Sequence, residues 1–173
     1  MKLRLLPLGL LLASSLTLAA DPEPVPKALE EQVGRLVELL RDSYATGYPE
    51  ATMTQTLDTG EESQVTLAVF TVEGFGMGNN YAQFLAAFTL EANEEGVPHY
   101  SLIDVVRIGG DSWRSIEKLN ARLVSDPAGD KTLIDIPVME NTDDDSPNFP
   151  TRAGVIHLSL DDSSQATRLL ELK

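Results

Sequence analysis

The segment from Gly74 to Asn80 is rich in glycine and could bind a phosphate or contact a partner. A dinucleotide-binding fingerprint requires the spacing G-x-G-x-x-G between a strand and a helix. In GFGMGNN the third glycine comes one residue early, and a strongly acidic chain is a poor host for a pyrophosphate. The interleaved apolar residues suit a hairpin tip that contacts a partner. The residues predicted to bind a partner here are Phe75, Gly76, Met77 and Asn79.

A second candidate is the segment Gly109 to Arg114, GGDSWR, which holds the only tryptophan of the chain. Trp113 and Arg114 beside a Gly-Gly turn could stack on a ligand or clamp a partner. A lone tryptophan at the end of a sheet more often caps the hydrophobic core. Both interpretations stay open, and Trp113 and Arg114 join the predicted partner-binding residues.

A third candidate is the acidic stretch Glu140 to Pro150, ENTDDDSPNFP. Hard cations such as calcium need several oxygen ligands that converge from a short loop. The candidate ligands are Asp143, Asp144 and Asp145. The ligand order of an EF-hand is not met, so a solvated acidic loop is the alternative.

The residue types that carry catalysis are few. The chain has no cysteine, which removes thiol nucleophiles and thiolate metal sites. His99 and His157 lie far apart without a metal-binding spacing, and no G-x-S-x-G elbow is present. The sequence therefore identifies no catalytic residue and implies no cofactor. A hydrolase whose site assembles only in space stays open.

The first twenty residues are typical of a secretory signal peptide. Lys2 and Arg4 form a basic start, Leu5 to Leu18 carries no charge, and small residues precede Asp21. The apolar stretch is shorter than the roughly 20 residues that span a bilayer. We expect cleavage that leaves no membrane anchor, a periplasmic or secreted location, and one globular domain over residues 21–173.

The charge balance narrows the class of partner. The chain has 27 acidic and 13 basic residues, a formal charge of -14. Cleavage after residue 20 removes two basic residues and no acidic one, which makes the charge -16. Such a surface repels nucleic acid and anionic lipid and favours a basic protein or cations.

Helical periodicity is confined to the start of the predicted domain. Apolar residues recur at helical spacing after Pro26, and Gly47 and Pro49 are expected to end the helix. The apolar stripe consists of Leu29, Val33, Leu36, Val37, Leu40 and Tyr44.

Two-residue alternation dominates the rest of the chain. In the range 65–72 both faces are apolar, which predicts a central strand. Residues 81–92 fit a helix or a strand, and their aromatic content and neighbours favour a strand. Pro137 indicates a sheet edge or a break in pairing. The other predicted strands are 52–58, 100–108, 116–124, 133–139, 155–160 and 167–172.

These elements predict an α+β domain, with one N-terminal amphipathic helix packed on a mainly antiparallel sheet of about seven strands.

Several runs also resemble a group of uncharacterised small exported proteins of Gram-negative bacteria. The runs are GFGMGNNYAQFLAAF, YSLIDVVRIGGDSWRSIEKL, VIHLSL and LLELK, within residues 65–173. The most specific part is the Gly-Gly-x-x-Trp-Arg step at 109–114. The resemblance implies a periplasmic location and a β-rich body, and it implies no activity.

The leading functional hypothesis is a non-enzymatic protein-binding module, such as an inhibitor or an immunity-like protein for a basic enzyme. A periplasmic protein that binds a small ligand or a cation is the alternative. A hydrolase is the second alternative.

Overall fold

The computed structural model describes residues 24–60, 63–127, 129, 131–163 and 166–172. The expected signal peptide, residues 1–20, lies outside the described residues. The described chain contains one α-helix, one short 3₁₀ helix and ten strands. The helices are α1 (Lys27–Leu40) and η1 (Pro49–Ala51). The strands are β1 (Thr46–Gly47), β2 (Met53–Gly60), β3 (Ser63–Phe75), β4 (Asn80–Ala92), β5 (Pro98–Gly110), β6 (Arg114–Ser115), β7 (Arg122–Val124), β8 (Thr132–Glu140), β9 (Arg152–Ser163) and β10 (Ala166–Glu171).

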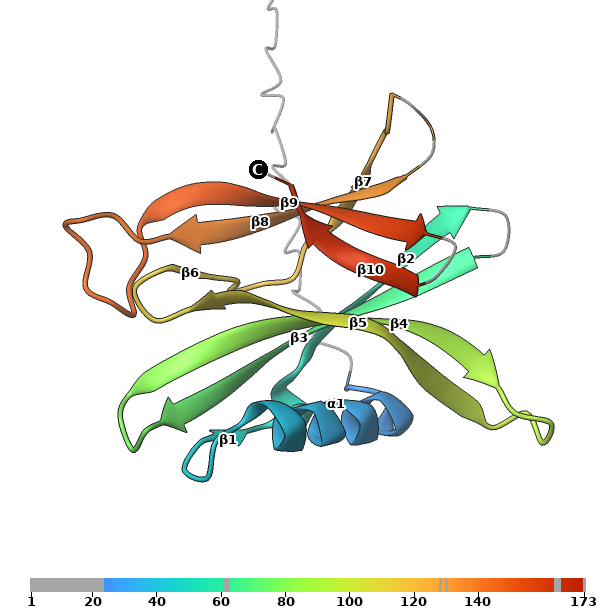
Figure 1. The fold of residues 1–173 in the computed structure, drawn as a ribbon, viewed down its shortest axis with the longest axis horizontal. Coiled ribbons are helices and arrows are strands. Elements are labelled where there is room, and N and C mark those ends of the chain that lie inside the picture. The colour runs from blue at the N-terminus through green and yellow to red at the C-terminus, as the bar shows by residue number, and fades with distance from the viewer. Residues whose placement is uncertain (1–23, 61–62, 128, 130, 164–165, 173) are drawn as a thin grey trace, which may run out of the picture.

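All ten strands belong to one antiparallel sheet. Its order is β1-β3-β4-β5-β6-β8-β9-β10, with β2 also paired to β3 and β7 also paired to β8. The sheet doubles over, so that β8, β9 and β10 lie above β3, β4 and β5 in Figure 1, while α1 lies below them. The helix, the first part of the sheet and the last part of the sheet therefore form three layers.

Strand β3 is second in the strand order rather than central, but it is paired on both sides and separates two hydrophobic cores, as its two apolar faces predict. Val65, Leu67 and Val69 face the core between the two parts of the sheet. Phe70 and Val72 point the other way, into the core beneath α1. Because successive side chains of a strand alternate between its faces, both faces of this strand must be covered.

The helix α1 covers one of these faces. It begins directly after Pro26, whose ring cannot donate a hydrogen bond but suits a helix start. Its buried residues are Leu29, Val33, Leu36 and Val37, all within the predicted stripe.

The predicted end of the helix is wrong. The helix stops at Leu40, and Tyr44, which the stripe included, is exposed. Gly47 instead lies against the side of the helix, where an added Cβ would come within 2.8 Å of Val37 Cγ2. This glycine serves close packing of β1 on α1 rather than termination of the helix.

The predicted fold class is also wrong. The structure is mostly antiparallel β, with a single short helix and ten strands instead of about seven. The difference arises mainly from β1 and β6, which have only two residues each. Such strands are too short to produce a detectable alternation.

The range 116–124, predicted to be one strand, pairs as a strand only in β7. The backbone between Ile116 and Ala121 instead forms hydrogen bonds with the side chains of two glutamines. Gln83 accepts from the N–H of Ile116 and donates to its carbonyl oxygen, at 2.8 and 3.0 Å. Gln55 does the same for Ala121, at 2.7 and 2.8 Å. A side-chain amide thus substitutes for a neighbouring strand, and sequence alternation does not reveal this.

Two other sequence predictions are confirmed. Residues 81–92 are extended within β4, which resolves the ambiguity between helix and strand. Pro137 lies in β8 at a break in pairing: β7 pairs as far as Asp135, and β6 begins to pair at Met139. Since proline has no N–H to donate, this gap is where the sheet tolerates it.

Replacing Gln83 tests the role of the glutamine side chains. The variant Gln83→Leu leaves the buried N–H and carbonyl of Ile116 without partners. We expect the free energy of unfolding to fall by about 2–4 kcal/mol, measured by urea denaturation. The exposed Gln64 on β3 provides the control, and Gln64→Leu should change stability by less than about 0.5 kcal/mol. Equal effects of the two variants would contradict this account.

Candidate functional site

The strand register brings all three candidate segments to one end of the molecule. Ala82, near the start of β4, pairs with Gly110 at the end of β5. Arg114 of β6 pairs with Glu140 at the end of β8, which in turn pairs with Arg152 at the start of β9. The connections 76–79, 111–113 and 141–151 therefore leave the sheet at the same end, on the left in Figure 1. The loop 41–45 joins them there, and we call these four segments the loop end.

The turn between β3 and β4 is fastened to the segment after α1 by one carboxylate. Asp42 Oδ2 accepts from the N–H of Gly76 at 2.9 Å. Its Oδ1 accepts from the N–H groups of Tyr44 and Ala45, at 2.9 and 2.7 Å. These three bonds hold the pKa of Asp42 below its usual value, with the bond from Gly76 the largest cause. The carboxylate thus fixes two backbone segments relative to each other.

The predicted partner-binding residues of this turn have different environments. Met77 has a left-handed backbone, with φ of 62°, and its side chain is 76% exposed. Asn79 is exposed as well, and Gly76 has a φ of 61°. Phe75, in contrast, packs partly against the core beneath α1. Met77 and Asn79 are therefore the two side chains of this turn that a partner can reach.

Arg114 is buried and fully engaged inside the protein. Its Nε donates to the carbonyl of Ile108 at 2.6 Å. Its two terminal nitrogens donate to the two carboxylate oxygens of Glu171, both at 2.8 Å. The guanidinium carbon also lies 4.1 Å from the centre of the Trp113 ring. Arg114 thus joins β5, β6 and β10. The guanidinium that the sequence suggested could clamp a ligand binds groups of the protein itself.

Trp113 does not cap the core, because 41% of it is exposed. One face of its ring lies over Arg114, and its carbonyl accepts from the N–H of Asn141 at 2.8 Å. Ser112 donates to the carbonyl of Pro147 at 2.8 Å. These bonds attach the β8–β9 loop to the turn that carries Trp113, so the tryptophan is a fixed part of the surface.

The three candidate metal ligands do not act together. Asp145 accepts from the N–H groups of Thr142 and Thr151 and from the Thr151 hydroxyl, at 2.8, 3.1 and 2.8 Å. The bond from the Thr142 N–H is the largest cause of its lowered pKa. Asp143 and Asp144 point to solvent. Across the described ranges, no group of three or more His, Asp or Glu side chains is arranged to hold a metal ion.

The two histidines lie on different strands. His99 is in β5, where it pairs with Glu91 of β4. His157 is on β9, where its Nδ1 lies 2.7 Å from Asp135 Oδ1 on β8. The histidine–aspartate contact is a cross-strand pair on the exposed face of the sheet.

Sequence reasoning missed two residues of the loop end. Tyr44 is 58% exposed and Phe149 is 72% exposed. The helical spacing assigned Tyr44 to the buried stripe, and Phe149 was considered only within the acidic loop. Local spacing gives no signal that would have excluded Tyr44, because it follows Leu40 by four residues, as a helical stripe requires.

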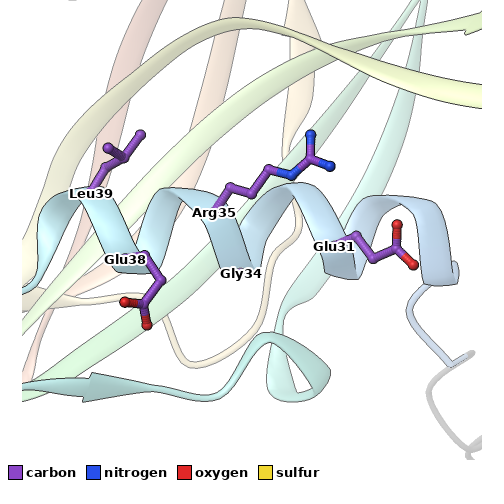
Figure 2. Close-up of a pocket in the computed structure, with 5 residues that line it drawn as sticks. All are labelled: Glu31, Gly34, Arg35, Glu38 and Leu39. Carbon is purple, nitrogen blue, oxygen red and sulfur yellow. The ribbon is translucent and has the colours of Figure 1, made fainter.

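A shallow hollow on α1 is a second surface feature. Its lining residues are Glu31, Gly34, Arg35, Glu38 and Leu39, all from the one helix (Figure 2). A Cβ added at Gly34 would lie 3.7 Å from Pro49 Cγ, an ordinary contact distance. The hollow carries charges of both signs. Because a single helix forms it, fewer side chains converge there than at the loop end.

The comparisons with known proteins add no relative. The chain matches no protein-family model, no curated protein and no solved structure. No helix within the described part of the chain is both long enough and apolar enough to cross a bilayer.

The contacts of Arg114 with Glu171 and with Trp113 can be tested through protein stability and the fluorescence of Trp113, which is the single tryptophan of the chain. Arg114→Lys keeps the charge but loses the two-pronged pairing with Glu171. We expect the free energy of unfolding to fall by about 1–3 kcal/mol and the Trp113 emission to change. The matched control is Arg152→Lys, because the Arg152–Glu140 ion pair is exposed and should contribute less than about 0.5 kcal/mol. An unchanged emission in Arg114→Lys would contradict the stacked geometry.

The hydrogen bonds that Asp42 accepts predict that the stability of this region depends on pH. Its bonds favour the carboxylate, so their stabilising contribution is complete above the ordinary pKa of 3.8 and is lost as the pH falls through the lower pKa of the folded state. The amide proton of Gly76 should therefore titrate with a midpoint below 3.8 in NMR spectra of the folded protein. In Asp42→Asn this transition of Gly76 should vanish. A midpoint at or above 3.8 would show that the bonds are not formed in solution.

Proposed function

We propose that the protein is an exported, acidic binding module that docks a basic protein at its loop end. The observation that carries the proposal is the meeting of exposed apolar and acidic side chains on loops with fixed backbones. The exposed apolar side chains are Tyr44, Met77, Trp113 and Phe149. The exposed acidic side chains of the β8–β9 loop are Asp143 and Asp144.

Large apolar side chains with acidic neighbours suit such an interface. Aromatic residues and methionine are enriched at the centres of protein interfaces, and a few of them supply most of the binding energy. Acidic residues around them speed the encounter with a basic surface and exclude acidic competitors. The overall charge, -14 for the full sequence and -16 after the expected cleavage, adds to this steering.

The rigidity of the loops supports the proposal further. Asp42 holds the β3–β4 turn, Asp145 holds the β8–β9 loop, and backbone bonds join that loop to the Trp113 turn. A surface that is ordered before binding loses less conformational entropy on association. Such an ordered surface suits an inhibitor or an immunity-like protein, which acts by occupying its partner. The predicted signal peptide supports an action in the periplasm or outside the cell.

The proposal predicts that the loop end, and not the opposite end, governs binding. The protein, expressed from its full sequence with a C-terminal tag, is used to isolate binding partners of any charge from cell envelope at low salt. The dissociation constant of each partner is then measured. Met77→Ser with Phe149→Ser should weaken binding tenfold or more, about 1.4 kcal/mol. Asp143→Asn with Asp144→Asn should reduce the salt dependence of binding.

The matched control lies at the β4–β5 hairpin, at the other end of these strands. Leu90 and Val97 are exposed there to a degree similar to Tyr44. Leu90→Ser with Val97→Ser should leave the dissociation constant unchanged. If this control weakens binding as much as the loop-end variant, or if no partner is basic, the proposed function is wrong.

A further inference from the structure

A small polar pocket lies within the loop end, between the segment that follows α1 and the β3–β4 turn. Its volume is about 310 Å³. Its lining residues are Tyr44, Thr46, Glu73, Gly74, Gly78 and Asn79. An added Cβ at Gly74 would lie 3.7 Å from the Tyr44 carbonyl oxygen, so the glycine leaves the space between the two segments open.

Glu73 gives the pocket an available negative charge. It pairs with Thr46 through the register of β1 and β3, and its side chain is exposed. Among the described residues its carboxylate has no hydrogen-bond or ion-pair partner. None of the six lining residues is basic. Arg41, in the adjoining loop, is already paired with Glu38 at 2.8 Å.

The other walls suit a planar cation. Tyr44 is half-exposed, and an aromatic ring attracts a guanidinium through its face. Asn79 adds an amide oxygen that can accept a hydrogen bond. The backbone N–H of Tyr44 is bound by Asp42, which also binds the N–H of Gly76 in the facing turn. The two walls are therefore held in place before any ligand arrives.

We propose that this pocket receives an arginine side chain of the basic partner. The inference rests on the proposed function, since it names the group by which that partner is recognised. A guanidinium offers donors for Glu73 and Asn79 together with a flat face for Tyr44, whereas an ammonium group offers only a point charge. The pocket therefore selects arginine over lysine.

The pocket can be tested without the partner. N-acetyl-arginine amide is titrated into the ¹⁵N-labelled protein, and the amide signals of Gly74 and Gly78 are followed. N-acetyl-lysine amide and the neutral N-acetyl-norleucine amide are compared at the same concentrations. The arginine derivative should shift these glycine signals in a saturable way, the lysine derivative should bind more weakly, and the norleucine derivative should leave the signals in place.

Variants identify the groups that bind the probe. Glu73→Gln keeps the shape of the side chain but removes its charge, and it should weaken arginine binding about fivefold or more. Tyr44→Leu should also weaken it, by removing the ring. Glu94→Gln changes an exposed carboxylate at the opposite end and should bind the probe as the unchanged protein does. The spectrum of each variant reports whether it is folded.

The outcomes separate this inference from the proposed function. If glycine shifts are absent, equal with norleucine, or unaltered in Glu73→Gln, the arginine pocket is wrong. The dependence of partner binding on Met77 and Phe149 would then still decide the proposed function. If the probe binds as expected but no basic partner depends on the loop end, the pocket stands and the docking of a basic protein is wrong.

Discussion

The apolar side chains on both faces of β3 and β4 impose the main constraint on this fold, because each face must be removed from water. The short helix α1 covers one face. The other face is covered only because the sheet doubles over and brings β8, β9 and β10 against it. Arg114 fixes the doubled sheet through Glu171, and Asp104 adds a bond to the N–H of Leu169. The same doubling gathers the loops of both layers at one end.

Side-chain bonds to the backbone determine the shape of that end. Asp42 and Asp145 each accept several donors, and both carboxylates have lowered pKa values for this reason. Gln55 and Gln83 play the corresponding role between the layers, where they bind a segment that has no strand beside it. These polar groups keep irregular segments ordered, so that Met77 and the other exposed apolar side chains are presented on a fixed surface.

Sequence periodicity predicted what depends on local spacing, and it did not predict what depends on distant partners. The two apolar faces of β3, the burial of Val33 and its neighbours, and the extended form of residues 81–92 follow from alternation and spacing. Gln55 and Gln83 form hydrogen bonds with the segment 116–121, and Arg114 is buried against Glu171. These partners lie tens of positions apart in the sequence, so no local pattern encodes them. Composition selected segments whose middle parts, 76–79, 111–113 and 141–151, connect strands, but their meeting at one end required the strand register.

The central claim is that a basic protein binds the loop end of this molecule. Site-specific photocrosslinking in intact cells tests it most directly, with a photoreactive amino acid introduced at Met77 in one strain and at Val97 in another. Both positions are exposed, and they lie at opposite ends of β4. The account predicts a covalent product with a basic protein from position 77 and little or none from position 97. Equal capture from both positions, or capture of acidic proteins at position 77, would contradict it.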